Sequence, residues 1–150
     1  MTKLFTYSFF ALLLLGCKSK SVVYNDPVPV HESVIIDSRF VQEKRVINIW
    51  TPPGYGDGGR AFSVLYMPDG GVGEDFPHIA NTLSELIKSN KIEPVILVGI
   101  ENTERGRDLT GRSIVDAHEK YGIPMTDGAK NLRAFILEEL VPEIERNYRL

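Results

Sequence analysis

Two short and almost wholly apolar runs most constrain how this chain folds: Phe62–Met67, "FSVLYM", and Pro94–Ile100, "PVILVGI". Runs of this length without polar alternation are typical of strands that are covered on both faces. The segment between them, Phe76–Ser89, has apolar residues at helical spacing, which predicts an amphipathic helix. The residues of this stripe are Ile79, Leu83, Leu86 and Ile87. The pattern predicts a sheet with helices packed on it.

The segments on either side extend this pattern into an α/β fold. Ser33–Phe40 and Arg45–Thr51 are rich in β-branched and aromatic residues and predict an antiparallel hairpin. Asp127 can cap a long helix that reaches about Arg146, with Pro142 as the expected kink. An antiparallel hairpin followed by strand, helix, strand and helix predicts a mixed sheet with helices on both faces.

The amino terminus has the layout of a secretory leader. Lys3 is followed by a largely apolar stretch that ends at Gly16 and is too short to span a bilayer comfortably. Leu14–Cys17, "LLGC", resembles the bacterial lipobox, in which the cysteine is diacylated and becomes the new amino terminus. The alternative is an incidental or buried thiol in an uncleaved leader.

These features predict three parts of the chain: a lipoprotein signal peptide over residues 1–16, a lipidated Cys17 with a flexible spacer over residues 17–32, and a partial α/β domain over residues 33–150. The expected location is the cell envelope, with the lipid on Cys17 as a membrane anchor. Lys18 after the cysteine favours the outer membrane, by resemblance to enterobacterial sorting rules.

Charge and composition narrow the classes of partner and cofactor. A net charge of −3 without basic clusters argues against binding to nucleic acid. Cys17 is the single cysteine, so a chain acylated there has no thiol left for a disulfide or a cysteine-based metal site. No Gly-x-Gly-x-x-Gly or Walker pattern is present, and we expect neither a cofactor nor a metal.

The most chemically suggestive segment is Val64–Gly71, "VLYMPDGG", in which a predicted strand runs directly into Asp-Gly-Gly. Glycines at the carboxyl end of a strand allow the backbone to approach a ligand and to present its N–H groups. Taken alone, the segment is more readily interpreted as a plain turn between a strand and a helix.

Four stretches, in order, resemble the Putative esterase family of α/β hydrolases, which includes esterase-D-like and enterochelin-esterase-like proteins: "INIWTPPGY", "VLYMPDG", "VILVGIENTERGRDLT" and "FILEELVPEIERNYR". The resemblance covers about residues 33–150. It implies the amino-terminal half of an α/β-hydrolase fold, truncated before the strand that carries the nucleophile. The Gly-x-Ser-x-Gly turn, the acid and the base histidine of the family are then expected beyond Leu150. This stretch alone is expected to be inactive.

The resemblance also assigns roles to residues that are present. Gly70 and Gly71 lie in the loop that supplies one N–H group to the oxyanion hole of α/β hydrolases. The loop Asn102–Arg112 leaves the next strand, where α/β sheets bind ligands. Its candidates for lining a substrate cleft are Asn102, Arg105, Arg107 and Asp108. An equally open alternative is that Arg107 and Asp108 pair with each other and only maintain the shape of the loop.

The remaining reactive residues do not form a complete site in the sequence. Ser63 on a predicted strand and Ser84 in a predicted helix are not placed as a nucleophile elbow would place them. The histidines lie in unrelated contexts, at His31, His78 and His118. The cluster "DAHEK", residues 116–120, is a weak candidate for a metal site.

The leading interpretation is therefore a fragment of a lipid-anchored bacterial serine esterase, which would hydrolyse a small-molecule carboxylic ester through an acyl-enzyme. Two alternatives stay open. One is a non-catalytic cell-envelope lipoprotein with a truncated hydrolase fold, and the other is an acyltransferase of the same fold.

The lipobox interpretation predicts that the protein, expressed in a Gram-negative host, partitions with membranes and incorporates labelled palmitate. Cys17→Ser should abolish the label, because it removes the thiol that accepts the diacylglyceryl group. Ser19→Ala is a matched control that should keep it. Unchanged labelling of Cys17→Ser would contradict the anchor.

Overall fold

The structure is a computed structural model that describes residues 25–113, 118, 120–122 and 125–150. Its centre is one four-stranded sheet with the order β1-β2-β4-β3. The strands are β1 (Glu32–Ser38), β2 (Glu43–Trp50), β3 (Ser63–Pro68) and β4 (Val95–Ile100). The helical elements are η1 (Tyr55–Asp57), α1 (Phe76–Lys88), α2 (Arg105–Asp108), α4 (Gly128–Phe135), η2 (Ile136–Leu140) and α5 (Val141–Asn147).

The predicted hairpin and mixed sheet are confirmed. β1 pairs antiparallel with β2, β2 pairs antiparallel with β4, and β3 runs parallel to β4. The hairpin turn comes slightly earlier than expected, because the Ser38 hydroxyl accepts hydrogen bonds from the N–H groups of Phe40 and Val41, both at 3.2 Å. Gln42 completes the turn with a positive φ of 56°.

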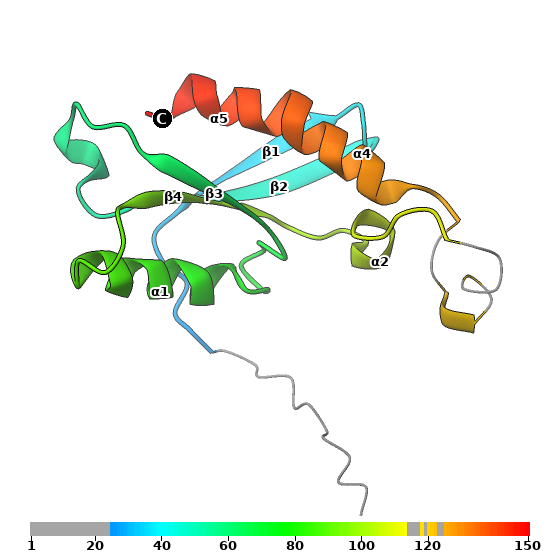
Figure 1. The fold of residues 1–150 in the computed structure, drawn as a ribbon, viewed down its shortest axis with the longest axis horizontal. Coiled ribbons are helices and arrows are strands. Elements are labelled where there is room, and N and C mark those ends of the chain that lie inside the picture. Colours follow the sequence, from blue (N-terminus) through cyan, green and yellow to red (C-terminus); the bar gives the residue numbers. More distant parts are fainter. Residues whose placement is uncertain (1–24, 114–117, 119, 123–124) are drawn as a thin grey trace, which may run out of the picture.

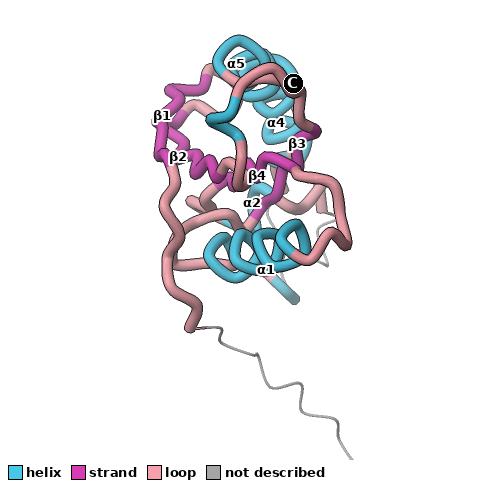
Figure 2. The backbone as a smooth tube through the Cα atoms, turned by 90° about the vertical axis from the view of Figure 1, so that its left-hand side faces the viewer, coloured by secondary structure: helices cyan, strands magenta, loops and turns pink. Residues whose placement is uncertain are grey.

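Helices cover both faces of the sheet (Figures 1 and 2). One face packs on the α4–α5 helix pair through a core that includes Ile47, Ile49, Ile96 and Val98. The opposite face packs on α1, where Trp50 and Leu97 meet buried residues of that helix. α1 agrees with its predicted range within one residue. The α/β class inferred from the sequence is therefore correct.

The carboxyl-terminal helix contains an irregularity at the place where the sequence predicts a kink. Asp127 caps it as expected, by accepting a hydrogen bond from the Lys130 N–H at 3.2 Å. η2 is a π-helical turn in which the Val141 N–H donates to the Ile136 carbonyl, five residues earlier. Pro142 follows directly, and a proline lacks the N–H of a regular helix and clashes with the carbonyl four residues before it. The wider turn accommodates this proline within a continuous helix.

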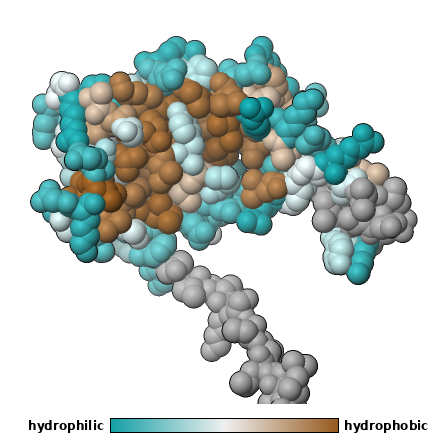
Figure 3. Space-filling view, viewed as in Figure 1, coloured by the Kyte–Doolittle hydropathy of each residue, from teal (hydrophilic) through white to brown (hydrophobic). Residues whose placement is uncertain are grey.

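β3 differs from the expectation that both apolar strands are covered on both faces. β4 meets that expectation, since Ile96, Leu97 and Val98 are fully buried. β3 instead forms the edge of the sheet among the described residues, and Leu65 is 42% exposed. Figure 3 shows apolar side chains gathered on this side of the molecule, between the α4–α5 pair and α1, where Figure 1 places β3.

Part of the expected spacer is in contact with the domain. Asp26 lies 3.0 Å from His78 of α1, and the Asn81 side chain donates to the Pro27 carbonyl at 2.8 Å. The ring of His31 meets that of Phe76 edge to face at 5.3 Å. Asp26, Pro27 and His31 therefore contact α1. Cys17 and the expected leader lie outside the described residues.

Within the part of the chain that the structure describes, no helix is both long and apolar enough to cross a membrane.

The exposed edge predicts that residues 18–150, expressed alone, are poorly soluble or oligomeric, because flat apolar edges recruit other strands. Leu65→Lys on β3 should shift the protein towards a monomer. Leu137→Lys is the matched control, since Leu137 is 51% exposed on η2, away from the edge. Size-exclusion chromatography with light scattering measures the mass. A cooperatively melting wild-type monomer would contradict this prediction.

Candidate active site

The candidate site is built on a backbone-to-backbone contact between the ends of β3 and β4. Gly70 lies against Gly99, and a Cβ atom added to Gly70 would be 2.3 Å from the Gly99 Cα. No side chain fits at that distance, so this contact requires glycine at position 70. Asp69, just before it, has a positive φ of 56°, which a non-glycine residue seldom adopts. The chain therefore turns sharply as it leaves β3.

The buried side chain of Asn48, on β2, stabilises this turn through a hydrogen bond. Its side-chain Nδ2 donates to the Gly70 carbonyl at 2.9 Å, and its Oδ1 accepts from the Ser33 hydroxyl at 2.7 Å. Asn48 is 1% exposed, so these bonds satisfy an amide that would otherwise be costly to bury. Asn48 was not among the residues predicted from the sequence. The available signal was a lone asparagine within the apolar strand "VINIW".

A polar cluster forms where the loops after β3 and β4 meet. The Asn102 side-chain Nδ2 donates to Asp69 at 2.5 Å and to Glu74 at 2.7 Å. Arg105 donates to Asp69 through its Nε at 2.7 Å and its Nη2 at 3.2 Å. The hydrogen bond from Arg105 is the main reason that the pKa of Asp69 lies below its usual range, and the bond from Asn102 adds to the effect. The structure thus brings Asn102 and Arg105 to the predicted glycine loop.

The two candidate oxyanion donors are engaged differently. The Gly70 N–H donates to the Ile100 carbonyl at 2.9 Å and so continues the pairing of β3 with β4. The Gly71 N–H donates to Oε2 of Glu74 at 2.7 Å. The Gly70 N–H is therefore bonded to the main chain of the sheet, and the Gly71 N–H is bonded to a side chain. Glu74 is a further residue that the sequence analysis did not identify.

Arg107 and Asp108 belong to a separate, buried cluster around Arg45. Arg107 and Asp108 pair through Nε and Oδ1 at 2.8 Å, which is the pairing that the sequence left as an alternative. Asp108 also accepts from Arg45 at 2.6 Å, and the two side chains are 2% and 1% exposed. Glu43 completes the cluster, with Arg45 at 2.5 Å and Arg107 at 2.6 Å.

The electrostatics of this cluster favour the charged forms. Burial raises the pKa of Asp108, but the hydrogen bonds and charges of Arg107 and Arg45 outweigh it, so the pKa lies below the usual range. Burial likewise opposes a low pKa for Glu43, and bonds from Thr103 and Arg107 lower it overall. The pKa of Arg107 is raised, mainly by its bond to Asp108. The cluster fastens α2 to β2 and thereby fixes the path of the loop that carries Asn102.

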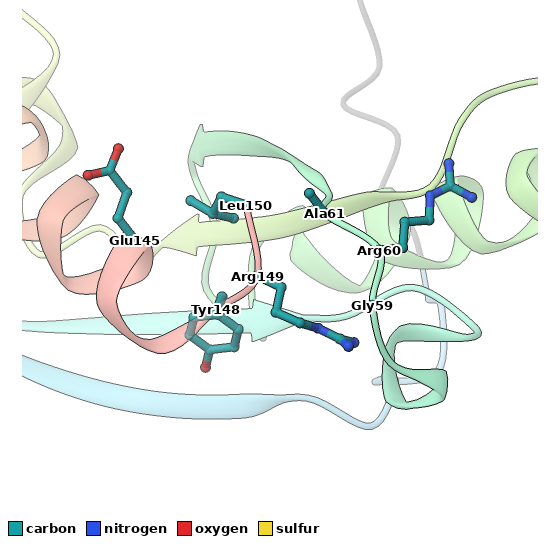
Figure 4. A pocket seen from close by; sticks show the side chains of 7 residues that line it. All are labelled: Gly59, Arg60, Ala61, Glu145, Tyr148, Arg149 and Leu150. Carbon is teal, nitrogen blue, oxygen red and sulfur yellow. The ribbon is translucent and has the colours of Figure 1, made fainter.

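Other cavities and reactive residues lie apart from this site. A cavity of about 540 Å³ lies beside the amino end of β3, opposite the glycine loop (Figure 4). Its lining includes Arg60, Tyr148 and Arg149. Among the described residues no group of three or more histidine, cysteine, aspartate or glutamate side chains could hold a metal ion. Most of the "DAHEK" segment lies outside those residues.

This fold, with a glycine turn at the carboxyl end of β3, is consistent with part of an α/β-hydrolase-like fold. The Putative esterase family model matches residues 38–150, and the chain belongs to that family. The similarity predicted from the four sequence stretches is therefore confirmed. No curated protein matches the chain.

Solved structures agree with this family. An IroE-like serine hydrolase from Shewanella oneidensis has 36% identity and a TM-score of 0.71, with 80% of this chain and 39% of that chain covered. The siderophore hydrolase EstA from Aspergillus nidulans shares the fold at 17% identity and a TM-score of 0.63, with 85% and 49% covered. The enterobactin esterase FES from Shigella flexneri has 15% identity and a TM-score of 0.53, with 81% and 27% covered. This chain therefore spans less than half the length of each.

Replacing an arginine of the buried cluster should destabilise the fold more than replacing an exposed arginine. Arg45→Ala should lower the free energy of unfolding by up to about 3–5 kcal/mol, because it leaves the buried Asp108 carboxylate with Arg107 as its remaining arginine partner. Arg60→Ala is the matched control. It removes an arginine from an exposed pair with Glu93 and should cost less than about 1 kcal/mol. Urea unfolding measures both substitutions in the Leu65→Lys background, the variant expected to favour the monomer, and equal effects would contradict the role of the cluster.

The low pKa of Asp108 predicts how the contribution of its carboxylate to the free energy of unfolding depends on pH. Asp108 stabilises the fold fully above its unfolded-state pKa of about 3.8, and the stabilisation is lost as pH falls through the lower folded-state pKa. The stability difference between wild type and Asp108→Asn should therefore shrink in acid. Asp37→Asn changes an exposed carboxylate of β1, and its free energy of unfolding at neutral pH should differ little from that of wild type.

Proposed function

We propose that residues 33–150 are the amino-terminal part of a serine esterase that hydrolyses a small carboxylic ester through an acyl-enzyme. The observation that carries the proposal is the glycine turn after β3, held beside the end of β4 in a chain of the Putative esterase family. The 36% identity to an IroE-like serine hydrolase supports the reaction class.

The proposed chemistry assigns a limited role to these residues. Ester hydrolysis builds negative charge on the carbonyl oxygen as the tetrahedral intermediate forms. A preorganised N–H group aimed at that oxygen stabilises the transition state, and the loss of one such donor costs about 2.7–4 kcal/mol. We assign this role to the loop of Gly70 and Gly71. The sequence contains no Gly-x-Ser-x-Gly, so the nucleophile, acid and base are assigned to residues beyond this stretch.

We further propose that the esterase is held at the cell envelope by lipid on Cys17, probed by the palmitate experiment above. The sequence "LLGC" after an apolar leader supports this anchor. In this arrangement the ester substrate reaches an enzyme outside the cytoplasmic compartment, and neither a metal nor an organic cofactor takes part in the reaction.

Reading the gene past codon 150 tests the proposal most directly. A downstream Gly-x-Ser-x-Gly, followed by an acid and a histidine, supports the esterase. A stop codon directly after codon 150 would overturn it in favour of a non-catalytic lipoprotein.

The proposal predicts that purified residues 18–150 do not hydrolyse p-nitrophenyl acetate above a buffer blank, because this stretch has no nucleophile elbow. A longer product of the same gene that contains the elbow should hydrolyse it and lose activity when the elbow serine becomes alanine. Activity of residues 18–150 that one serine substitution abolishes would show that the site has been assigned wrongly.

A further inference from the structure

The Glu74 carboxylate occupies a site made of N–H groups from two separate loops. Its Oε2 accepts from the Gly71 N–H at 2.7 Å and from the Asn102 N–H at 3.3 Å. Its Oε1 accepts from the Asn102 side chain at 2.7 Å. Three donors thus converge on one carboxylate, at the carboxyl edge of the sheet, where α/β folds bind ligands.

The side chains of Glu74 and Glu101 pack closely against Gly71. A Cβ atom on Gly71 would lie 2.8 Å from the Glu74 carboxylate and 2.9 Å from a side-chain carbon of Glu101. Residue 71 therefore has no room for a side chain, and its backbone N–H meets the Glu74 oxygen directly. Gly71 is buried, whereas Glu74 is only half-buried. The carboxylate can therefore turn towards solvent while its donors stay in place.

The neighbouring donor, the Gly70 N–H, is bonded in a different way from the Gly71 N–H. The Gly70 N–H is tied to the Ile100 carbonyl within the sheet, so releasing it would break the pairing of β3 with β4. The Gly71 N–H is held by a side chain, which a rotation of Glu74 would release. Of the two glycines, Gly71 is the one whose N–H can reach a ligand without a change in the sheet.

We propose that the Gly71 and Asn102 N–H groups form an oxyanion site for a ligand carbonyl or carboxylate oxygen, and that Glu74 fills this site until a ligand displaces it. The identification of the ligand as an ester rests on the proposed function, whereas the occupation by Glu74 rests on the contacts above. Glu74 is thus an internal competitor of the substrate, and the resting site is closed.

A simpler role for Glu74 is to stabilise the turn before α1. The Glu74 N–H donates to the Gly71 carbonyl at 2.9 Å, so the two residues bond reciprocally across that turn. The two roles differ in one measurable respect. A ligand site emptied of Glu74 should accept a free carboxylate, whereas a turn that has lost its side-chain bond should not.

Hydrogen–deuterium exchange of the full chain, resolved at Gly71 and Asn102, distinguishes these roles. Glu74→Ala should exchange about tenfold faster than wild type at Gly71, since a hydrogen bond to a charged group is lost. Acetate, used as the probe, should slow exchange again at both positions, and chloride at equal ionic strength should not. Acetate without effect in Glu74→Ala would overturn the proposal.

Asp75→Ala is the matched control. It removes an exposed carboxylate one residue away, whose side chain accepts no hydrogen bond in the described part of the chain. Wild type and Asp75→Ala should keep slow exchange at Gly71 and should not respond to acetate. An equal response to acetate in Asp75→Ala would overturn the proposal, because the effect would then follow from net charge.

The Gly70 N–H reports whether the loop itself survives, since its bond to Ile100 does not involve Glu74. If Gly70 loses protection in Glu74→Ala, the decision passes to Glu74→Gln, which keeps an oxygen acceptor but no charge. Acetate must then slow exchange at Gly71 in Glu74→Gln more than in wild type, or the proposal fails. Hydrolysis is not measured, so failure here is distinguishable from failure of the proposed function.

Discussion

The close contact between Gly70 and Gly99 is the constraint on which the rest of the site depends. At 2.3 Å from a hypothetical Cβ on Gly70 to the Gly99 Cα, the two backbones leave no room for a side chain. This approach lets β3 and β4 stay paired beyond Pro68 and Ile100, through the Gly70 N–H. It also brings the loops that follow both strands together, which allows Asn102 to reach Asp69 and Glu74. The polar cluster is a consequence of two glycines.

The sequence predicted the elements whose burial follows a simple period. β4, α1 and the β1–β2 hairpin follow from apolar runs and spacing, and Asn102 and Arg105 follow from the rule that ligands bind at the carboxyl ends of strands. The contacts of Glu74, Arg45 and Asn48 could not be predicted this way, because each joins segments that only the tertiary fold brings together. Whether Gly70, Gly71, Asn102, Arg105, Arg107 and Asp108 act on a substrate stays a prediction.

The carboxyl-terminal helix keeps one apolar face in spite of an irregular turn. A regular helix places Leu132, Ile136 and Leu140 on one face, because they are spaced four residues apart. In the structure Leu132 and Leu140 are buried, and Ile136 packs, partly buried, against the same core. Phe135 and Ile144 are buried there as well. The π-helical turn between Phe135 and Val141 takes up one residue more than an α-helical turn, so that both halves of the helix present apolar residues to the same face of the sheet.

The strand order has a consequence for the order of folding. β4 lies between β2 and β3, yet it is the last of the four strands along the chain. The first two strands can pair locally as a hairpin, but an isolated hairpin is marginally stable in water. Among the described residues β3 pairs with β4 alone, so β3 has no partner strand before β4 is in place. β4 therefore supplies the non-local pairings of the sheet, with β2 on one side and β3 on the other. Because such pairings close long loops, they are the contacts expected to limit the folding rate of this sheet.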